Sequence, residues 1–307
     1  MLKIGVLGLG NIAQKAYLPT YVQYQNRATF YFATRNDEVL QQLKAKYQLQ
    51  HTYHTLDELI DQKIDACFIH TATNSHYELI KQCLLNGIHV YVDKPVSEKQ
   101  EQVEELFQLA KEKQCHLQVG FNRRKAPFVQ KLKAIPEKRI LHLSKNRLAH
   151  SREVGFEIFD LFLHLVDTAV YLLDEPIEQM SSHIQTLPDG LLSFASMTLH
   201  TQNSLAHLTM DMYSGSNQEK YSLTSKQGTY QVNNLVEWIE EVNQQKTYQT
   251  FNDWDTTLYK RGFESVVSDF LDTLEQAKPI DIDNYQLAIL SHRLCADMLR
   301  QYNQEKK

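Results

Sequence analysis

The stretch between residues 2 and 24 constrains the fold of this chain more than any other. An apolar, β-rich run, Leu2–Leu7, leads into the pattern Gly8-x-Gly10-x-x-Ala13, and an amphipathic segment follows as far as Tyr24. This order of strand, glycine turn and helix is typical of a dinucleotide-binding βαβ unit. Gly8 permits the tight turn, Gly10 lets the backbone approach a pyrophosphate, and the small Ala13 lets the helix pack on the strand.

Strand and helix patterns alternate over roughly the first 120 residues. Strands are predicted at 3–7, 29–33, 66–70, 89–92 and 116–119, with a weak one at 52–53, and helices begin near Asn11, Asp37, Leu56, His76 and Glu98. Three of the helix starts carry a capping-box pattern, at Thr55–Glu58, Ser75–Glu78 and Ser97–Gln100. The alternation predicts a doubly wound α/β fold, a parallel sheet covered on both faces with ligands at the carboxyl ends of its strands. The N–H groups at Asn11 and Ile12 would then face the phosphates.

The pattern changes after Gly120. Helices are predicted at 126–135, 159–173, 258–276 and 284–303, and β-like runs at 139–148, 179–187, 191–200, 204–213, 220–226 and 229–232; residues 244–246 resemble a polar loop. Successive strands flanked by helices predict an α+β domain on a largely antiparallel sheet. We therefore expect a dinucleotide-binding domain over residues 1–122 and a substrate-binding and oligomerisation domain over residues 123–307.

Composition argues against several kinds of partner. The 32 Lys and Arg against 37 Asp and Glu give a net charge of −5 without a basic block, so nucleic acid is not expected. We expect no membrane span, because the apolar runs are too short, and no signal peptide, because the first residues already form a strand pattern. The four cysteines are scattered, which favours buried thiols in the cytoplasm, and the close pair His51 and His54 lacks further ligands, so no metal site is predicted.

The choice of dinucleotide depends on the end of the second strand, about 20 residues past the glycine turn. Thr34-Arg35-Asn36 stands there. An acidic residue would accept a hydrogen bond from the ribose 2′-OH, whereas a hydroxyl followed by a guanidinium favours a 2′-phosphate. We predict NADP(H) over NAD(H). The alternatives are that Asp37 holds the ribose, or that Arg35 is simply solvated.

Asp93-Lys94-Pro95 follows the fifth predicted strand, at the ligand edge of the sheet. Proline keeps Lys94 out of the helical region, so an ammonium is held where the nicotinamide is expected. Such a lysine can donate to a substrate hydroxyl and stabilise developing negative charge. A surface lysine before a turn would show the same pattern.

The predicted helix 159–173 carries a narrow polar stripe, because Asp160, His164, Asp167 and Tyr171 follow the spacing i, i+4, i+7, i+11. Asp160 and His164 lie one turn apart, so the carboxylate can orient an imidazole that titrates near neutrality and suits general acid/base catalysis. The exposed edge of an amphipathic helix would give the same stripe.

Two further segments are candidates for ligand contacts. The loop after the fourth strand offers hydroxyls and a helix start that can line a cofactor, although helix capping would also explain its composition; its residues are Thr71, Ala72, Thr73, Asn74, Ser75 and His76. Arg123 and Arg124 stand where the first domain ends. They can hold an anionic substrate or cofactor group, or form ion pairs between the domains.

Together these motifs resemble the Gfo/Idh/MocA (glucose–fructose oxidoreductase/inositol dehydrogenase) family, and within it the MviM-type oxidoreductases. The resemblance covers essentially the whole chain and runs in order through Gly8–Ala13, Thr71–His76, Asp93–Pro95, Gly120–Arg124 and Asp160–His164. It implies a Rossmann domain and a second domain whose open sheet makes homodimer or homotetramer contacts. It also implies hydride transfer between NAD(P) and a carbinol or ketone, often of a sugar or polyol.

The resemblance implies roles for single residues as well. Lys94 matches the lysine that contacts substrate near the nicotinamide, and Asp160 and His164 match the acid and the proton-transferring histidine. Arg123 and Asp167 are further candidate substrate residues. The chain departs from the family's usual Glu-Lys-Pro, because Asp93, a candidate cofactor residue with Lys94, replaces the glutamate. Residues 153–159 replace the glycines that often precede the aspartate, which leaves the substrate class open.

We therefore expect an oxidoreductase that prefers NADP(H) and acts on a small molecule. In oxidation His164 takes the hydroxyl proton, Lys94 donates to the substrate oxygen, and Asp160 supports the imidazolium. The main alternative is a regulator or redox sensor that binds the cofactor without turnover. A protein-interaction scaffold built on the open sheet is a third.

Overall fold

The structure is a computed structural model that describes residues 1–149 and 151–306. The chain divides into two compact units, Met1–Phe121 with Phe263–Ile289 and Asn122–Gly262 with Leu290–Lys307. The sequence places one boundary at residue 122; the structure shows in addition that residues 263–289 pack with the first unit.

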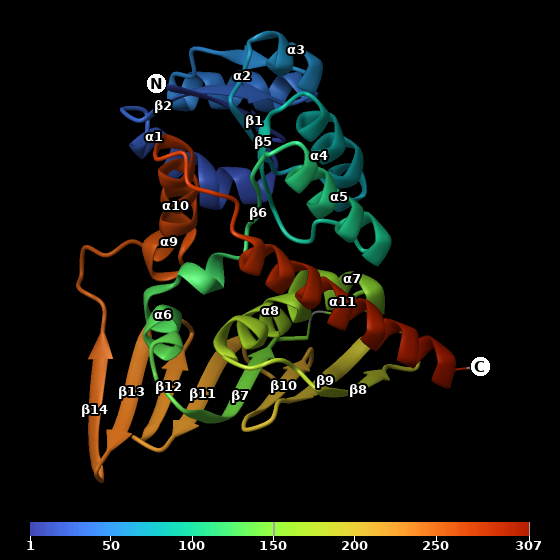
Figure 1. Cartoon of the computed structure of the whole chain (residues 1–307), viewed down its shortest axis with the longest axis vertical. Helices are drawn as coiled ribbons and strands as arrows, with labels where there is room; N and C mark the ends of the chain where they lie inside the picture. Colours follow the sequence, from blue (N-terminus) through green and yellow to red (C-terminus); the bar gives the residue numbers. More distant parts are fainter. Residues whose placement is uncertain (150, 307) are drawn as a thin grey trace. The chain divides into compact units, whose positions relative to one another are not determined.

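The first unit contains, within the described residues, a six-stranded sheet in the order β3-β2-β1-β4-β5-β6 (Figure 1). All of its strand pairs are parallel; the strands are β1 (Leu2–Leu7), β2 (Ala28–Ala33), β3 (Thr52–Tyr53), β4 (Ala66–Ile69), β5 (His89–Val92) and β6 (Leu117–Val119). Its helices are η1 (Ala13–Tyr17, a π-helix), α1 (Leu18–Gln23), α2 (Asp37–Tyr47), α3 (Leu56–Asp61), η2 (Thr73–Ser75), α4 (His76–Leu85), α5 (Gln100–Glu112) and α10 (Phe263–Glu275). This strand order is that of a Rossmann domain, so the predicted doubly wound α/β fold is confirmed.

The segment 263–289 joins the first unit through side chains that the sequence pattern does not relate to it. On α10, Phe270 packs edge-on against Phe68 of β4, with ring centroids 5.3 Å apart. The hydroxyl of Tyr285 donates to the carbonyl of Cys115 at 3.1 Å and accepts from the N–H of Leu117 at 2.7 Å. These two hydrogen bonds give partners to the carbonyl of Cys115 and the N–H of Leu117, two backbone groups at the edge strand β6.

The second unit contains, again within the described residues, an eight-stranded sheet in the order β14-β13-β12-β11-β7-β10-β9-β8. Its strands are β7 (Lys138–Asn146), β8 (Gln179–Thr186), β9 (Leu192–His200), β10 (Leu205–Asp211), β11 (Gln218–Ser225), β12 (Thr229–Asn233), β13 (Glu237–Val242) and β14 (Gln245–Thr250). The described pairs are antiparallel apart from β7 with β10. The largely antiparallel second sheet is therefore confirmed.

Helices cover one face of this sheet and leave the other open (Figure 1). The helices of this unit are η3 (Asn122–Lys125), α6 (Pro127–Lys133), α7 (Val154–Glu157), η4 (Ile158–Phe162, a π-helix), α8 (Leu163–Leu172) and α9 (Thr257–Lys260), with the later part of α11 (Ile282–Glu305); α6 and α8 contact the sheet directly. Along β7, Leu141 and Leu143 are buried on the helical face, whereas His142 on the other face is exposed. This alternation is expected for a sheet with one covered face.

Three local expectations were wrong. Residues 244–246 are not merely a loop: Asn243 and Gln244, both with positive φ, form the turn of the hairpin between β13 and β14. The helix expected over 258–276 is interrupted at Gly262, whose φ is +79°. The helix expected over 159–173 begins with the π-helix η4, which places Asp160 in a wider turn than the α-helix period assumes.

Candidate functional site

The glycine turn after β1 has the geometry that a pyrophosphate requires. Gly8 has φ +91°, and a Cβ there would lie 2.8 Å from backbone atoms of His70 and Thr71. At Gly10, by contrast, a Cβ would meet no described atom within 4 Å, so the backbone borders open space. Ala13 is fully buried. The residues at this turn therefore fit a dinucleotide, with the first-turn N–H groups directed at its phosphates.

The loop after β2 carries the residues that would meet the adenosine ribose. Thr34 is half-buried and Arg35 is exposed, while Asn36 caps α2 by accepting from the N–H of Val39 at 3.1 Å. The carboxylate of Asp37 lies 3.4 Å from Nδ1 of His54. Arg35 is thus accessible to a 2′-phosphate, and the nearest acidic side chain in sequence is turned toward a histidine.

The loop after β4 is fixed by a buried histidine. Nδ1 of His76 lies 2.8 Å from the carbonyl oxygen of Pro95, and its Nε2 lies 3.0 Å from that of Thr71. Burial lowers the pKa of His76, although both carbonyls favour its charged form. Because His76 is 1% exposed, we infer that it joins two cofactor-side loops and does not itself face a ligand. Ala72 and Asn74 in the same loop are exposed.

Asp93, at the end of β5, turns its carboxylate into the protein. Its Oδ1 accepts from the N–H of Lys94 at 3.2 Å and from the hydroxyl of Tyr17 at 3.4 Å, and the Tyr17 hydroxyl lies 3.0 Å from that of Tyr91. Burial and the charge of Asp93 raise the pKa of both tyrosines well above the usual value, so both hydroxyls remain protonated. A Cβ at Gly120 would come within 2.9–3.2 Å of these three side-chain oxygens. The carboxylate therefore fixes the backbone beside Lys94.

Lys94 itself is half-buried, and its peptide bond to Pro95 is cis. Its loop follows β5, and the loops that hold Gly8, Arg35 and Thr71 follow β1, β2 and β4. These four strands are neighbours in the sheet. The four loops therefore lie at one edge of the sheet, where Rossmann domains bind their ligands.

In the second unit, the two arginines of η3 meet the polar stripe of α8. Nη1 of Arg123 lies 3.0 Å from Nδ1 and 3.1 Å from Nε2 of His164. Nε of Arg124 donates to both carboxylate oxygens of Asp167, at 2.9 and 3.1 Å. His164 and Asp167 are 8% and 1% exposed, so the stripe is not the solvent-facing edge of a helix. Asp160, on η4, is half-buried.

Arg123 is held by a cluster of buried charges. Its Nε and Nη2 donate to the two carboxylate oxygens of Glu219 at 2.8 and 3.1 Å, and Nζ of Lys145 donates to the same carboxylate at 2.6 Å. The hydroxyl of Tyr221 also donates to Glu219. Burial lowers the pKa of Lys145 to about 8; burial would raise the pKa of Glu219, but Arg123 and Lys145 hold it well below its usual value.

This arrangement bears on the two residues predicted as substrate contacts. Asp167 accepts from Arg124 and, at 3.1 Å, from the hydroxyl of Ser291. We infer a structural role for Asp167, since its acceptor sites are used within the unit. Arg123 is 7% exposed and forms an ion pair with Glu219, but this pair lies inside the second unit and not between the two domains as the alternative expected.

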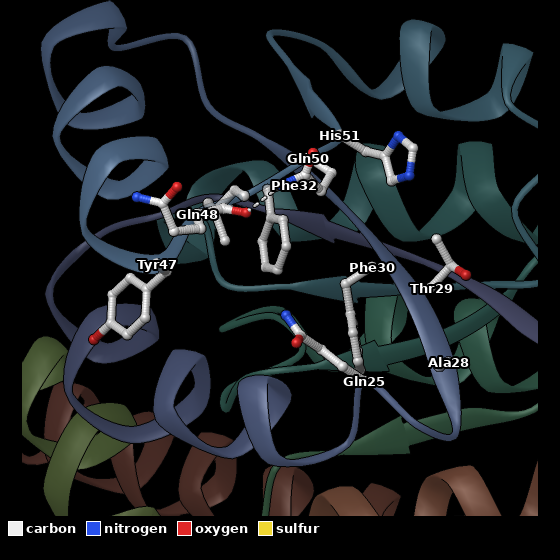
Figure 2. A pocket seen from close by; sticks show the side chains of 10 residues that line it. Gln25, Ala28, Thr29, Phe30, Phe32, Tyr47, Gln48, Gln50 and His51 are labelled. Atoms are coloured by element: carbon white, nitrogen blue, oxygen red, sulfur yellow. Dashed lines mark hydrogen bonds between the residues drawn. The ribbon is translucent and has the colours of Figure 1, made fainter.

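A cavity of about 400 Å³ lies elsewhere, beside β2 and the loop before β3. Figure 2 shows Phe30 and Phe32 of β2 beside it, with Tyr47 from the end of α2 and His51 from the loop before β3. It reaches Ala28 and Gln25 at the amino end of β2, away from the carboxyl ends that carry the loops above. Among residues 1–149 and 151–306, no group of three or more metal-ligating side chains is gathered, and no helix there is long and apolar enough to cross a membrane.

Two family models match the chain. The model described as "Oxidoreductase family, NAD-binding Rossmann fold" (GFO_IDH_MocA) matches residues 2–121, and the YceM-like C-terminal domain matches residues 127–243. The first range contains β1–β6, the strands of the six-stranded sheet, and the second contains β7–β13 of the eight-stranded sheet.

Similar proteins extend the match over the whole length. YceM of Salmonella typhimurium, named as an oxidoreductase, is 31% identical over 308 residues, which cover 97% of each chain. The crystal structure of the dehydrogenase MviM from Clostridium difficile has a TM-score of 0.92 and 30% identity, and the match covers 98% of this chain and 99% of that one. Myo-inositol 2-dehydrogenase of Thermotoga maritima is 26% identical over 200 residues, 61% of this chain and 60% of its own. The chain therefore belongs to the Gfo/Idh/MocA family of oxidoreductases, with an NAD-binding Rossmann domain at its amino-terminal end.

Proposed function

We propose that the protein is a dehydrogenase that moves hydride between NADP(H) and the carbinol carbon of a small polyol or sugar-like substrate. The observation that carries this proposal is the anchoring of Lys94. The carboxylate of Asp93, itself held by the hydroxyl of Tyr17, accepts directly from the backbone N–H of Lys94, at the sheet edge where Gly10 leaves open space for a pyrophosphate. A cofactor there supplies or takes up the hydride.

In the direction of oxidation, Lys94 donates a hydrogen bond to the substrate hydroxyl oxygen and stabilises the negative charge that develops there. His164 takes the hydroxyl proton through an unprotonated ring nitrogen. The C–H bond breaks as its electron pair leaves with the hydrogen for the nicotinamide, and the carbinol becomes a carbonyl. Asp160 supports the charge that His164 acquires. Reduction follows the same steps in reverse.

The polyol class is favoured because a relative with this fold is named as a dehydrogenase of myo-inositol. NADP(H) is favoured because Arg35 is exposed after β2, where its guanidinium can pair with a 2′-phosphate.

We also propose that the open face of the second sheet makes homodimer or homotetramer contacts, since Ile140 and Phe194 are 42% and 41% exposed there. Light scattering of Phe194→Lys, which should be monomeric, tests this assembly.

The function is tested in two stages. NADPH is titrated by its own fluorescence, because Trp238 is buried and Trp254 is 95% exposed, so neither is a suitable reporter. Inositols, sugars and their keto forms are then screened for turnover. With a substrate found, Lys94→Ala and His164→Ala should each lose at least about 100-fold in kcat, and in His164→Ala the Kd for NADPH should change little. Lys99→Ala, at an exposed position, serves as the matched control.

The outcomes separate the candidate functions. Full activity in His164→Ala would reject its role in proton transfer. NADPH binding without turnover of any carbinol or carbonyl would favour a regulator or redox sensor. Failure to bind either dinucleotide would favour a scaffold.

A further inference from the structure

The guanidinium of Arg123 lies against the imidazole of His164, with Nη1 at 3.0 and 3.1 Å from the two ring nitrogens. A guanidinium can only donate hydrogen bonds and keeps its charge at every relevant pH. Nη1 is nearly equidistant from the two ring nitrogens, so the positive charge lies over the imidazole ring and not on the lone pair of one nitrogen. An imidazolium in this place would bring two cations together with little water between them, since both side chains are nearly buried.

The position of Arg123 is set by strands beneath the helix and does not depend on His164. Glu219 on β11 and Lys145 on β7 are paired in register, and the carboxylate of Glu219 receives both Arg123 and Lys145. Glu219 and Lys145 are each 6% exposed. Two cations thus share one carboxylate, so the cluster has a surplus of positive charge beside His164.

Several other titratable groups lie near α8 within the second unit. Asp167, on the same helix, is already paired with Arg124, and β10, which packs beneath α8, presents Ala206, Leu208 and Met210. Tyr221, next to Glu219, is kept protonated because burial and Glu219 raise its pKa well above the usual value. Two carboxylates precede His164 in the chain, the half-buried Asp160 and the buried Glu157, and the buried His292 of α11 follows Ser291, which donates to Asp167.

We infer that Arg123 is a positioning residue that holds His164 in its neutral, proton-accepting form. This inference rests on the proposed proton transfer by His164 and adds a direction to it. A neutral imidazole is ready to take a proton, so the site is set for oxidation of a hydroxyl at neutral pH. Reduction, which needs the imidazolium, is favoured as the pH falls.

The test is a pH titration of His164 by NMR of the Cε1–H signal in histidine-labelled, full-length protein, with the signal assigned by its loss in His164→Gln. Removal of the cation in Arg123→Met should raise the titration midpoint by about one to two pH units. Removal of the anion in Glu219→Gln should lower it. Arg123→Lys, which keeps the charge, should stay within about half a unit of wild type. Arg139→Met, at an exposed position on β7, is the matched control and should not move it.

Opposite shifts in Arg123→Met and Glu219→Gln are the signature of a charge effect, because loss of structure alone would move both variants the same way. An unchanged or lowered midpoint in Arg123→Met overturns the inference. If that variant does not fold, the double variant Arg123→Met/Glu219→Gln removes both members of the buried pair, and its midpoint must exceed that of Glu219→Gln.

The titration needs no substrate, so its result is separate from the proposed function. Absence of turnover with a raised midpoint in Arg123→Met would reject the proposed function alone. Where a substrate is found, the acid limb of kcat/KM for oxidation should move to higher pH in Arg123→Met by the same interval, while the Kd for NADPH stays unchanged.

Discussion

The pair Arg124 and Asp167 gives the sharpest prediction about stability. Asp167→Asn keeps the size of the side chain and removes its charge, which deprives the guanidinium of Arg124, 5% exposed, of this carboxylate. Breaking a buried pair by removing one partner costs about 3–5 kcal/mol. For a unit of this size each kcal/mol lowers Tm by roughly 2–4 °C, so we expect Tm to fall by roughly 6–20 °C.

Removing both charges of this pair is expected to cost less stability than removing only one of them. Burial raises the pKa of Asp167 in spite of Arg124, which means that the attraction does not fully offset the loss of hydration. Replacing both side chains by apolar ones of similar volume is therefore expected to recover most of the lost stability. The double variant Arg124→Met/Asp167→Leu should therefore be more stable than Asp167→Asn, because it leaves no buried charge without its partner.

Thermal and urea unfolding followed by circular dichroism measures these differences, with Glu137→Gln as the control. Glu137 pairs with Lys226, but both side chains are more than half exposed, so its loss should cost less than about 1 kcal/mol. A Tm for Asp167→Asn within about 2 °C of wild type would refute the reasoning. The same variant, assayed well below its Tm, should keep the wild-type KM; a large rise in KM would restore Asp167 as a substrate residue.

Three further predictions concern the cofactor, the backbone and acid stability. Arg35→Ala should weaken NADPH binding about tenfold or more and leave NADH binding nearly unchanged, as measured by fluorescence titration; tighter binding of NADH than NADPH in wild type would contradict the assignment. Gly262→Ala should cost at least about 2 kcal/mol by urea unfolding, because φ is +79° and the new Cβ would collide with the carbonyl oxygen of Asn122. Because the pKa of Glu219 is depressed on folding, its contribution is present above its ordinary value of 4.5 and is lost as the pH falls further; wild type should lose stability below that pH more steeply than Glu219→Gln.

The sequence predicted the first unit well because a parallel sheet between helices leaves a strong signal. Its strands are buried on both faces, so they form short apolar runs separated by helical periods. Capping was less predictable. Thr55 and Glu58 form the expected capping box, but Ser75 ends the short helix η2 and its hydroxyl donates to Thr71 and Ala72 instead. A pattern of residue types does not tell which of several local acceptors a hydroxyl will use.

The missed strands show where the pattern fails. All six residues of β14 are exposed, so this edge strand has no buried face and no apolar alternation for a sequence to display. On β13, Trp238 is 1% exposed but lies among glutamates, and a single aromatic residue does not define a period. Likewise the segment 263–289 is amphipathic by sequence, but nothing in its spacing says which unit its apolar face covers.

Only part of the candidate site could be predicted, because the spacing of residues along a helix does not show what the helix faces. Periodicity placed His164 and Asp167 on one face of a helix, yet it could not say whether solvent, substrate or another side chain faces them. Their partners are 41 and 43 residues away in sequence, and the carboxylate that holds Arg123 is 96 residues away. Contacts at such separations depend on the packing of the helix on its sheet, which residue type and spacing do not encode.

The two adjacent arginines show why an arginine at position 123 is not interchangeable with a lysine. Arg124 uses its guanidinium on one carboxylate of α8, so it makes a neutral clamp. Arg123 spreads its nitrogens over different groups: Nε and Nη2 bind Glu219, while Nη1 reaches both the amide oxygen of Asn122, at 3.2 Å, and His164. A lysine places its charge at a single atom and cannot hold Glu219 on two oxygens while keeping a fixed donor at the imidazole. Arg123→Lys should therefore preserve the charge beside His164 but lose its orientation. The expected result is a titration midpoint near that of wild type together with a lower kcat, a combination that a purely electrostatic role would not produce.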